Sequence, residues 1–129
     1  MIAIDTNVLL RLFQHEDDPE QTALARALIR QNAPIFLHDI VIVEFVWTCR
    51  RLFKLERKAV HALLEAIAES TEFVVGNPEQ FDQALRGYGK MKSDFSDWLL
   101  GVSNLGHGCD ATFTFDQGAL KCRGFKLVE

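Results

Sequence analysis

Apolar and polar positions alternate in blocks along the chain, and these blocks predict short strands separated by helices. The apolar, β-capable residues 2–4 predict a buried strand, and polar Thr6 and Asn7 open a second apolar segment with helical spacing. Further apolar runs of strand length lie at residues 35–37, 73–75, 111–115 and 125–128. This alternation indicates an α/β fold with a mostly parallel central sheet of about four or five strands, flanked by helices on both faces.

Helix starts are the clearest local signals. Asp18 and Asn77 are each followed directly by proline, which combines a capping side chain with the residue favoured at the first helical position. Residues 40–53 are ambiguous between strand and helix, because this run is β-branched and almost continuously apolar. Its length favours a helix, and we expect Asp39 to cap it.

Two acidic residues follow predicted strands directly. Asp5 ends the first strand and Asp116 ends the strand at residues 111–115. Because right-handed crossovers place the carboxyl ends of parallel strands along one edge, we expect Asp5 and Asp116 to share that edge, where α/β proteins bind ligands. Capping of the following helix is the competing explanation for Asp5. Thr6 and Asn7 are alternative caps, and we expect them to leave Asp5 free.

Three further acids stand at unusual positions. Glu44 lies within an apolar run and has no Lys or Arg three or four residues away, so it either faces solvent or belongs to a site. Asp94 and Asp97 fall on one face of a first helical turn, where the helix dipole favours acids. Two like charges so close together are tolerated on a wet surface and better tolerated beside a divalent cation. Carboxylates converging without His or Cys suit Mg²⁺ or Mn²⁺.

Composition limits the classes of protein that remain. The 129 residues, of which 48% are hydrophobic, suit one domain at 1–129. The formal charge of −4 argues against a broad basic surface for nucleic acid, so any such role depends on something local, such as a metal. With no leader pattern and no apolar run of membrane length, we expect a cytoplasmic protein without membrane contact. Cys49, Cys109 and Cys122 form no CxxC pair, and we expect buried free thiols.

Four acidic motifs lie in order along the chain. They are Asp5-Thr-Asn-Val-Leu-Leu-Arg11, Glu44 within its apolar helix, Asp94-Phe-Ser-Asp97-Trp-Leu-Leu and Thr114-Phe-Asp116. Together they resemble the motifs of PIN-domain nucleases, specifically the VapC-type toxins of bacterial toxin–antitoxin pairs, and the resemblance spans the chain. Two departures concern the last acid: the segment after Asp116 lacks the aromatic often found there, and Trp98 is bulky where small residues are common.

The resemblance implies a small endoribonuclease that uses Mg²⁺ or Mn²⁺ to activate water. By position, the acidic quartet is Asp5, Glu44, Asp97 and Asp116, with Asp94 as an auxiliary metal ligand. Glu44 would bind metal or position the attacking water. The residues expected to orient the carboxylates are Asn7 and Thr114, and the candidates for contact with the RNA backbone are Arg11, Lys90 and Lys92. For each of these three cations, ordinary surface charge is an equally good explanation.

The resemblance also implies two protein partners, a cognate antitoxin and a second copy of the chain in a homodimer. An apolar surface near the first helix and Phe45, Trp47 and Phe53 would accept an antitoxin helix, unless these aromatics belong to the core. The RNA target is not readable from the sequence.

Two other classes of function compete with the nuclease. A phosphatase of the haloacid dehalogenase type also begins with a strand and an Asp, but it needs a second Asp where this chain has Asn7. It also needs an acid pair spaced four apart, whereas Asp94 and Asp97 are three apart. The second alternative is a non-catalytic interaction module of the PIN fold, in which the acids hold only a structural ion.

Overall fold

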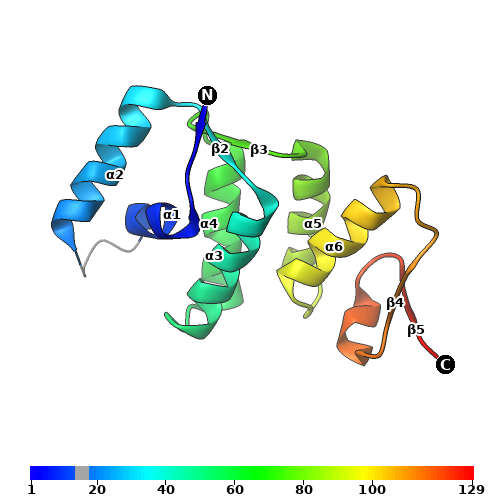
Figure 1. Cartoon of the computed structure of the whole chain (residues 1–129). Helices are drawn as coiled ribbons and strands as arrows, with labels where there is room; N and C mark the ends of the chain where they lie inside the picture. Colours follow the sequence, from blue (N-terminus) through cyan, green and yellow to red (C-terminus); the bar gives the residue numbers. More distant parts are fainter. Residues whose placement is uncertain (14–17) are drawn as a thin grey trace.

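Strands and helices alternate along most of the chain, as the sequence predicts. The structure, a computed structural model, describes residues 1–13 and 18–129. Its elements are β1 Ile2–Ala3, α1 Thr6–Phe13, α2 Pro19–Asn32, β2 Ile35–Leu37, α3 Asp39–Arg51, α4 Arg57–Glu69, β3 Phe73–Val75, α5 Pro78–Lys90, α6 Phe95–Gly106, β4 Thr112–Thr114, a 3-10 turn η1 Gln117–Lys121 and β5 Phe125–Leu127 (Figure 1). No helix among the described residues is long and apolar enough to cross a membrane.

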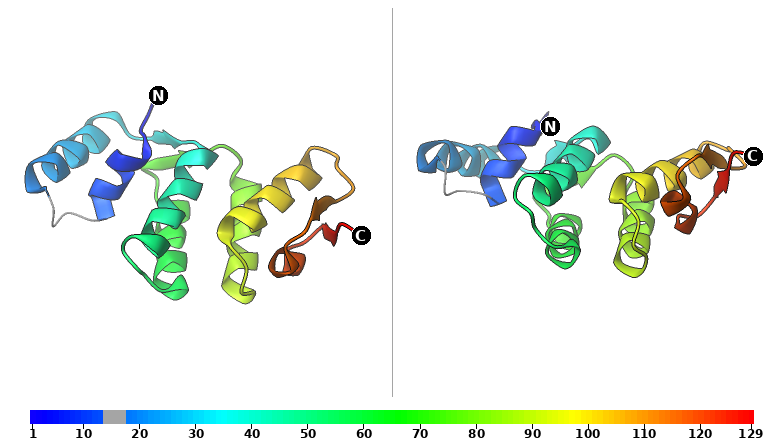
Figure 2. Two further views of the ribbon diagram at one scale, coloured as in Figure 1. Left: turned by 60° about the horizontal axis from the view of Figure 1, so that its bottom comes forward. Right: turned by 90° about the horizontal axis from the view of Figure 1, so that it is seen from below.

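The strands lie in two parallel sheets. β1, β2 and β3 pair in that order, and β4 pairs with β5 in a separate sheet. The α/β class and the parallel pairing are confirmed, and the five strands of the described residues agree with the predicted four or five, although they form two sheets where one central sheet was predicted. The prediction that Asp5 and Asp116 share one sheet edge is wrong, because β4 does not pair with β1 in the described part of the chain. Figures 1 and 2 show α3, α5 and α6 between β1 and the β4–β5 pair.

Packing of α6 on α5 explains this separation. A Cβ added at Gly87 of α5 would overlap the indole ring of Trp98 on α6, so the bare glycine surface receives that ring. Trp98 is buried there, which explains why a bulky residue is accommodated at this position. Because α6 follows α5, it carries the chain away from β1 before β4 begins.

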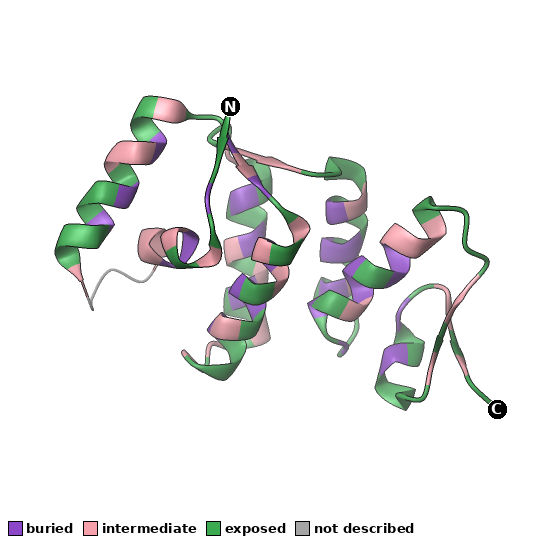
Figure 3. Cartoon of the chain, viewed as in Figure 1, coloured by how far each residue is buried: buried purple, intermediate pink, exposed green. Residues whose placement is uncertain are grey.

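The core forms one contiguous cluster shared by most elements (Figure 3). Its fully buried side chains include Leu9, Ile35, Leu37, Ile42, Phe45, Val60, Leu64 and Phe95. The outer strands are less buried than predicted, since Ile2 is 36% exposed and Phe113 and Phe115 are 64% and 83% exposed. Among the described residues, β1 and β4 are edge strands of their sheets.

Of the caps predicted for α2, α5 and α3, the first two are confirmed. The carboxylate of Asp18 accepts a hydrogen bond from the Gln21 N–H, and the Asn77 side chain accepts one from the Gln80 N–H, each at 3.0 Å. For α3 the prediction is wrong by one residue: His38 Nδ1 accepts from the Ile40 N–H, and Asp39 is the first helical residue.

The three cysteines are free thiols, as predicted, but they differ in burial. Cys49 and Cys122 are buried, and burial raises the pKa of each thiol to about 11. Cys109 is exposed on the segment between α6 and β4, so the prediction of burial is wrong for this residue.

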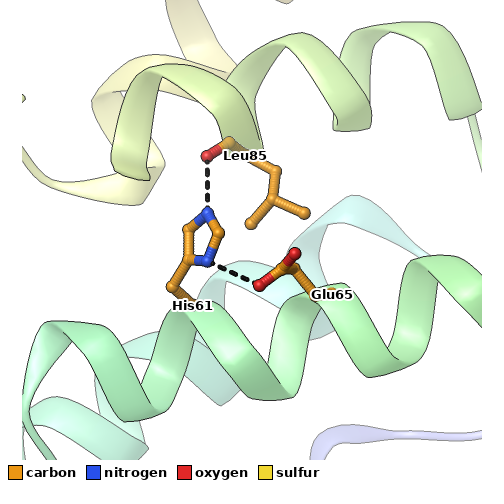
Figure 4. A network of polar contacts seen from close by, with 3 residues as sticks. All are labelled: His61, Glu65 and Leu85. Carbon is orange, nitrogen blue, oxygen red and sulfur yellow. Dashed lines mark hydrogen bonds and ion pairs between the residues drawn. The ribbon is translucent and has the colours of Figure 1, made fainter. Parts of the chain in front are cut away.

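His61 joins α4 to α5 (Figure 4). Its Nδ1 lies 3.0 Å from Glu65 Oε1 on the same helix, and its Nε2 lies 3.2 Å from the backbone oxygen of Leu85. The ring also stacks on Tyr88, with centroids 6.3 Å apart. These contacts fix α5, whose last turn leads into the segment that carries Asp94.

Replacing Gly101 by Ala tests how the C-terminal sheet is held on α6. The added Cβ would lie 2.7 Å from Phe125 Cε2 and 2.9 Å from the Arg123 backbone oxygen. Because backbone cannot yield cheaply, we expect Gly101→Ala to lower the free energy of unfolding by about 1–3 kcal/mol, measured by urea denaturation.

The matched control is Gly106→Ala in the same helix. There the new Cβ meets only the mobile end of the Gln80 side chain, so we expect a change within about 0.5 kcal/mol. Equal destabilisation by both substitutions would contradict the proposed docking of β5 on α6.

Candidate functional site

Three carboxylates gather where α6 begins and β4 ends; they are called the C-terminal acid group and comprise Asp94, Asp97 and Asp116. Asp94 occupies the cap position of α6 but forms no side-chain capping hydrogen bond. Burial, together with the negative charges of Asp94 and Asp116, raises the pKa of Asp97. The three side chains therefore lie within one electrostatic field.

No Lys or Arg side chain of the described residues forms an ion pair with this group. The ion pairs of the described residues join His61 to Glu65 and Arg86 to Asp82. Asp116 Oδ1 accepts one hydrogen bond, from the Gly118 N–H at 2.8 Å. The group thus keeps an excess of negative charge that a bound cation would offset.

A second pair of carboxylates, Asp5 and Glu44, lies at the start of α1 and on α3. Asp5 Oδ1 accepts from the Val8 N–H at 3.1 Å, so Asp5 itself caps α1. The prediction that Thr6 and Asn7 do the capping is wrong, because the Thr6 hydroxyl instead donates to Glu44 Oε1 at 3.3 Å. Glu44 is exposed, which removes the cost of a buried charge. Both acids line one open cavity of about 500 Å³.

The structure does not bring these five acids into a single cluster. Across the described residues, no group of three or more His, Cys, Asp or Glu is arranged to hold one metal ion. α3 contacts both α1 and α6 and lies between the two sets. Glu44 faces both sides, since it lines the cavity with Asp5 and also a groove with Ser96 and Leu99 of α6.

The other residues predicted for the site lie at separate places in the structure. The Thr114 hydroxyl oxygen accepts from the Asp116 backbone N–H at 2.9 Å, so it orients the backbone of that acid. Asn7 is exposed and lines the cavity beside Asp5. Arg11 donates from Nε to Gln21 Oε1 at 2.8 Å, which engages part of its guanidinium. Lys90 and Lys92 are exposed, at the end of α5 and in the segment before Asp94.

Arg57 organises the turn that leads to Asp94, and the sequence interpretation missed it. Its guanidinium donates to the backbone oxygens of Ser93 at 2.8 Å, Tyr88 at 2.8 Å and Met91 at 2.6 Å, and lies 4.1 Å from the centroid of the Tyr88 ring. A signal existed, because an Arg in the first turn of a helix opposes the helix dipole and therefore suggests another partner.

Ser93 extends this support to Asp116. Its buried hydroxyl donates to the Gly118 backbone oxygen at 3.0 Å, while the Gly118 N–H donates to Asp116. A hydrogen-bonded path therefore runs from Arg57 through the α5–α6 turn to the backbone beside the last acid.

Comparison with known proteins identifies the family. A sequence model of the PIN domain matches residues 2–123. The chain belongs to the PIN domain family. It is also similar to a VapC ribonuclease of Aquifex aeolicus (strain VF5), with 27% identity over 130 residues that cover 99% of this chain and 96% of that protein. The resemblance found in the sequence is therefore confirmed at the level of the family.

In this PIN domain, the segment after Asp116 uses backbone groups where an aromatic is often found. Gly118 gives its N–H to Asp116 and its oxygen to Ser93. A Cβ at Gly118 would lie 3.1 Å from Asp116 Oδ1 and press on the carboxylate. The small residue therefore allows the close approach that orients the acid.

Removing the Arg57 guanidinium should destabilise the PIN domain. Arg57→Ala leaves three backbone oxygens without their donors, and we expect the free energy of unfolding to fall by about 2–4 kcal/mol in urea denaturation. Arg57→Lys should recover only part of this loss, because an ammonium cannot reproduce the forked contacts. Arg86→Ala, which breaks an exposed pair with Asp82, should change stability by less than about 0.5 kcal/mol. Equal losses at Arg57 and Arg86 would contradict this role.

Neutralising Asp97 should stabilise the metal-free protein. Its folded pKa is raised, so its favourable contribution is present below the unfolded pKa and is lost as pH rises through the folded pKa. At pH 7 in EDTA, Asp97→Asn should raise Tm by roughly 2 °C, as expected for less than about 1 kcal/mol in a domain of this size.

Two comparisons check the cause of that gain. It should vanish at a pH low enough to protonate Asp97 in the wild-type protein. Asp82→Asn, which removes an acid already paired with Arg86, should give no gain. A lower Tm for Asp97→Asn at pH 7 would contradict the repulsion.

Proposed function

We propose that this PIN domain is a metal-dependent endoribonuclease that acts as the toxin of a toxin–antitoxin pair. The observation that carries the proposal is the gathering of Asp94, Asp97 and Asp116 without a Lys or Arg ion pair among the described residues, with the pKa of Asp97 raised by burial and by the charges of the other two acids. The similarity to a VapC ribonuclease supports RNA as the substrate.

The donors suit a hard divalent cation. Carboxylate oxygens without Cys or His favour Mg²⁺ or Mn²⁺ over softer metals. Mg²⁺ keeps several of its waters, so a few direct carboxylate contacts suffice, and the acids need not all touch the ion. Asp97 would hold the ion together with Asp94 or Asp116, and the remaining acids would contact it through its bound waters. When bound, the metal would supply an activated water and stabilise charge on the phosphate.

The protein groups would orient the reactants. The Thr6 hydroxyl engages Glu44 Oε1, so Oε2 remains to accept a hydrogen bond from water or from a ribose hydroxyl. The Val8 N–H holds Asp5 Oδ1 in the same way and leaves Oδ2 outward. Asn7 would contact either carboxylate from the cavity wall, and Thr114 holds the backbone of Asp116.

A cognate antitoxin would be the inhibitory partner, and a second copy of the chain would complete a homodimer. An open, mainly apolar groove of about 490 Å³ lies between α1 and α2, lined by Val8, Leu24 and Leu28. It would accept an apolar antitoxin helix. Of the three aromatics considered from the sequence, Phe45 is core, Phe53 is half-buried and Trp47 is exposed.

Membership of the PIN domain family leaves one of the two functions that compete with the nuclease. The haloacid dehalogenase type of phosphatase is not supported, since the chain is a PIN domain. A non-catalytic PIN module remains as the competitor, and cleavage assays separate it from the nuclease.

Purified protein should cleave single-stranded RNA with Mg²⁺ or Mn²⁺ and lose this activity in EDTA. Asp97→Asn and Asp116→Asn should each lower the cleavage rate at least about 100-fold, the order of effect of removing one electrostatic contact to a transition state. Asp110→Asn, an exposed acid close in sequence to β4, should cleave at the wild-type rate.

Gel analysis of labelled RNA gives the rates, and two results would overturn the proposal. Wild-type protein without cleavage under either metal would favour the non-catalytic module. Cleavage that survives both substitutions would indicate a contaminating nuclease. Expression of wild-type protein without its antitoxin should arrest growth, whereas the Asp97→Asn protein should be harmless.

A further inference from the structure

A pocket of about 450 Å³ opens beside Asp94, between the second half of α3, the segment joining α3 to α4, and the start of α6. We call it the Trp47 pocket. Its lining includes the aromatic Trp47, the cations Arg50, Arg51, Lys54 and Arg57, and the acids Glu56 and Asp94, so cations outnumber acids by four to two. Four of the chain's 14 basic residues therefore line one pocket of a protein with a net charge of −4. This local concentration of positive charge adjoins the C-terminal acid group.

Two of these four cations, Arg50 and Arg57, already form hydrogen bonds within the fold. Arg57 binds three backbone oxygens, and Arg50 donates from Nη1 to the Leu55 oxygen at 2.8 Å. Arg51 and Lys54 are exposed and form no ion pair with any described residue. The helix dipole favours Arg51 in the last turn of α3 but does not explain Lys54, which lies beyond the helix. Both side chains are therefore available to a ligand.

Trp47 adds an aromatic face to the same pocket. It is 54% exposed, whereas Phe45, two residues earlier on α3, is fully buried. A largely exposed indole next to cations is the combination by which proteins hold single-stranded nucleic acid: bases stack on the ring and phosphates meet the charges.

We propose that the Trp47 pocket binds the single-stranded RNA beside the bond to be cleaved, with a base stacked on Trp47 and backbone phosphates on Arg51 and Lys54. This inference rests on the proposed ribonuclease function and names the substrate contacts of that site. Asp94 lines the pocket and belongs to the acid group, so a strand leaving the pocket on that side passes the acids. An acidic protein segment would use the cations equally but would gain less from an open indole face.

Binding in EDTA tests the pocket separately from cleavage. A labelled oligoribonucleotide of mixed sequence is titrated with wild-type protein at several salt concentrations and followed by fluorescence anisotropy. The variant Arg51→Gln with Lys54→Gln should raise Kd at least about tenfold and reduce the slope of log Kd against log salt by about 1.4, for two phosphate contacts. The matched control, Arg26→Gln with Arg30→Gln, removes two exposed charges from α2 and should retain the wild-type Kd.

Substitutions at Trp47 test the stacking contact. Trp47→Ala should raise Kd about tenfold, and Trp47→Phe should restore most of the affinity because it keeps an aromatic face. RNA should also quench wild-type tryptophan fluorescence, and this quenching should be lost in Trp47→Phe, where the buried Trp98 is the remaining tryptophan. Since the three substituted residues, Trp47, Arg51 and Lys54, are exposed, the circular dichroism spectra and Tm of these variants should match those of the wild-type protein.

The outcomes separate the pocket from the proposed function. If wild-type protein cleaves RNA with Mg²⁺ but both sets of variants bind RNA as tightly as wild type, the proposal that the Trp47 pocket binds RNA is overturned. The proposed ribonuclease function is then unaffected. If wild-type protein neither binds nor cleaves RNA, the proposed function fails and the pocket with it. If the double variant loses affinity for a polyglutamate peptide but not for RNA, the pocket serves an acidic protein partner and the inference is overturned.

Discussion

The half-buried carboxylate of Asp97 is influenced by the negative charges of Asp94 and Asp116, and contacts from several elements hold the backbone around these groups. Burial and the two neighbouring negative charges raise the pKa of Asp97, so its ionised form is disfavoured when no cation is bound. Arg57 lines a pocket with Asp94, yet its three hydrogen bonds go to the backbone oxygens of Tyr88, Met91 and Ser93. The fold thus uses its nearby cation to fix the backbone and leaves the carboxylates free to bind something else.

The support of this acid group comes from parts of the chain that are distant in sequence. Arg57 reaches from α4 to the α5–α6 turn, and Ser93 reaches from that turn to Gly118 after β4. Gly101 lets β5 approach α6 closely, which docks the sheet that ends in Asp116. Each contact joins a different pair of elements, so together they determine where the three acids lie relative to one another.

Local features of the fold followed from the sequence, and features set by distant contacts did not. Asp18 and Asn77 cap their helices as predicted, since a cap requires only its own next few residues. The predicted strand at residues 111–115 exists, but nothing within it specifies whether its partner is β1 or β5. The pairing depends on how α6 packs, which is decided by the Trp98 ring against Gly87.

The same distinction applies to the site. The acids were found because carboxylates at strand ends and in apolar helices are locally anomalous. The role of Thr6 was missed because its partner, Glu44, is 38 residues away. Trp47 offers no local sign of its exposure either, since its apolar neighbours on α3 include both buried and open positions.

α3 connects the two sets of acids and carries the groups that would bring RNA to them. Glu44 and Trp47 are three residues apart on this helix, a spacing that places them on adjacent parts of one surface. An acidic protein must attract a polyanion locally, because its overall charge repels it. Few phosphate contacts imply that affinity depends only weakly on salt concentration. For two to three contacts to a single strand, the logarithm of the association constant should fall against the logarithm of the salt concentration with a slope of roughly −1.4 to −2.1. In the proposed ribonuclease, RNA binding would then depend more on stacking and on the metal than on long-range attraction, which favours unpaired segments of RNA over duplexes whose bases are already stacked.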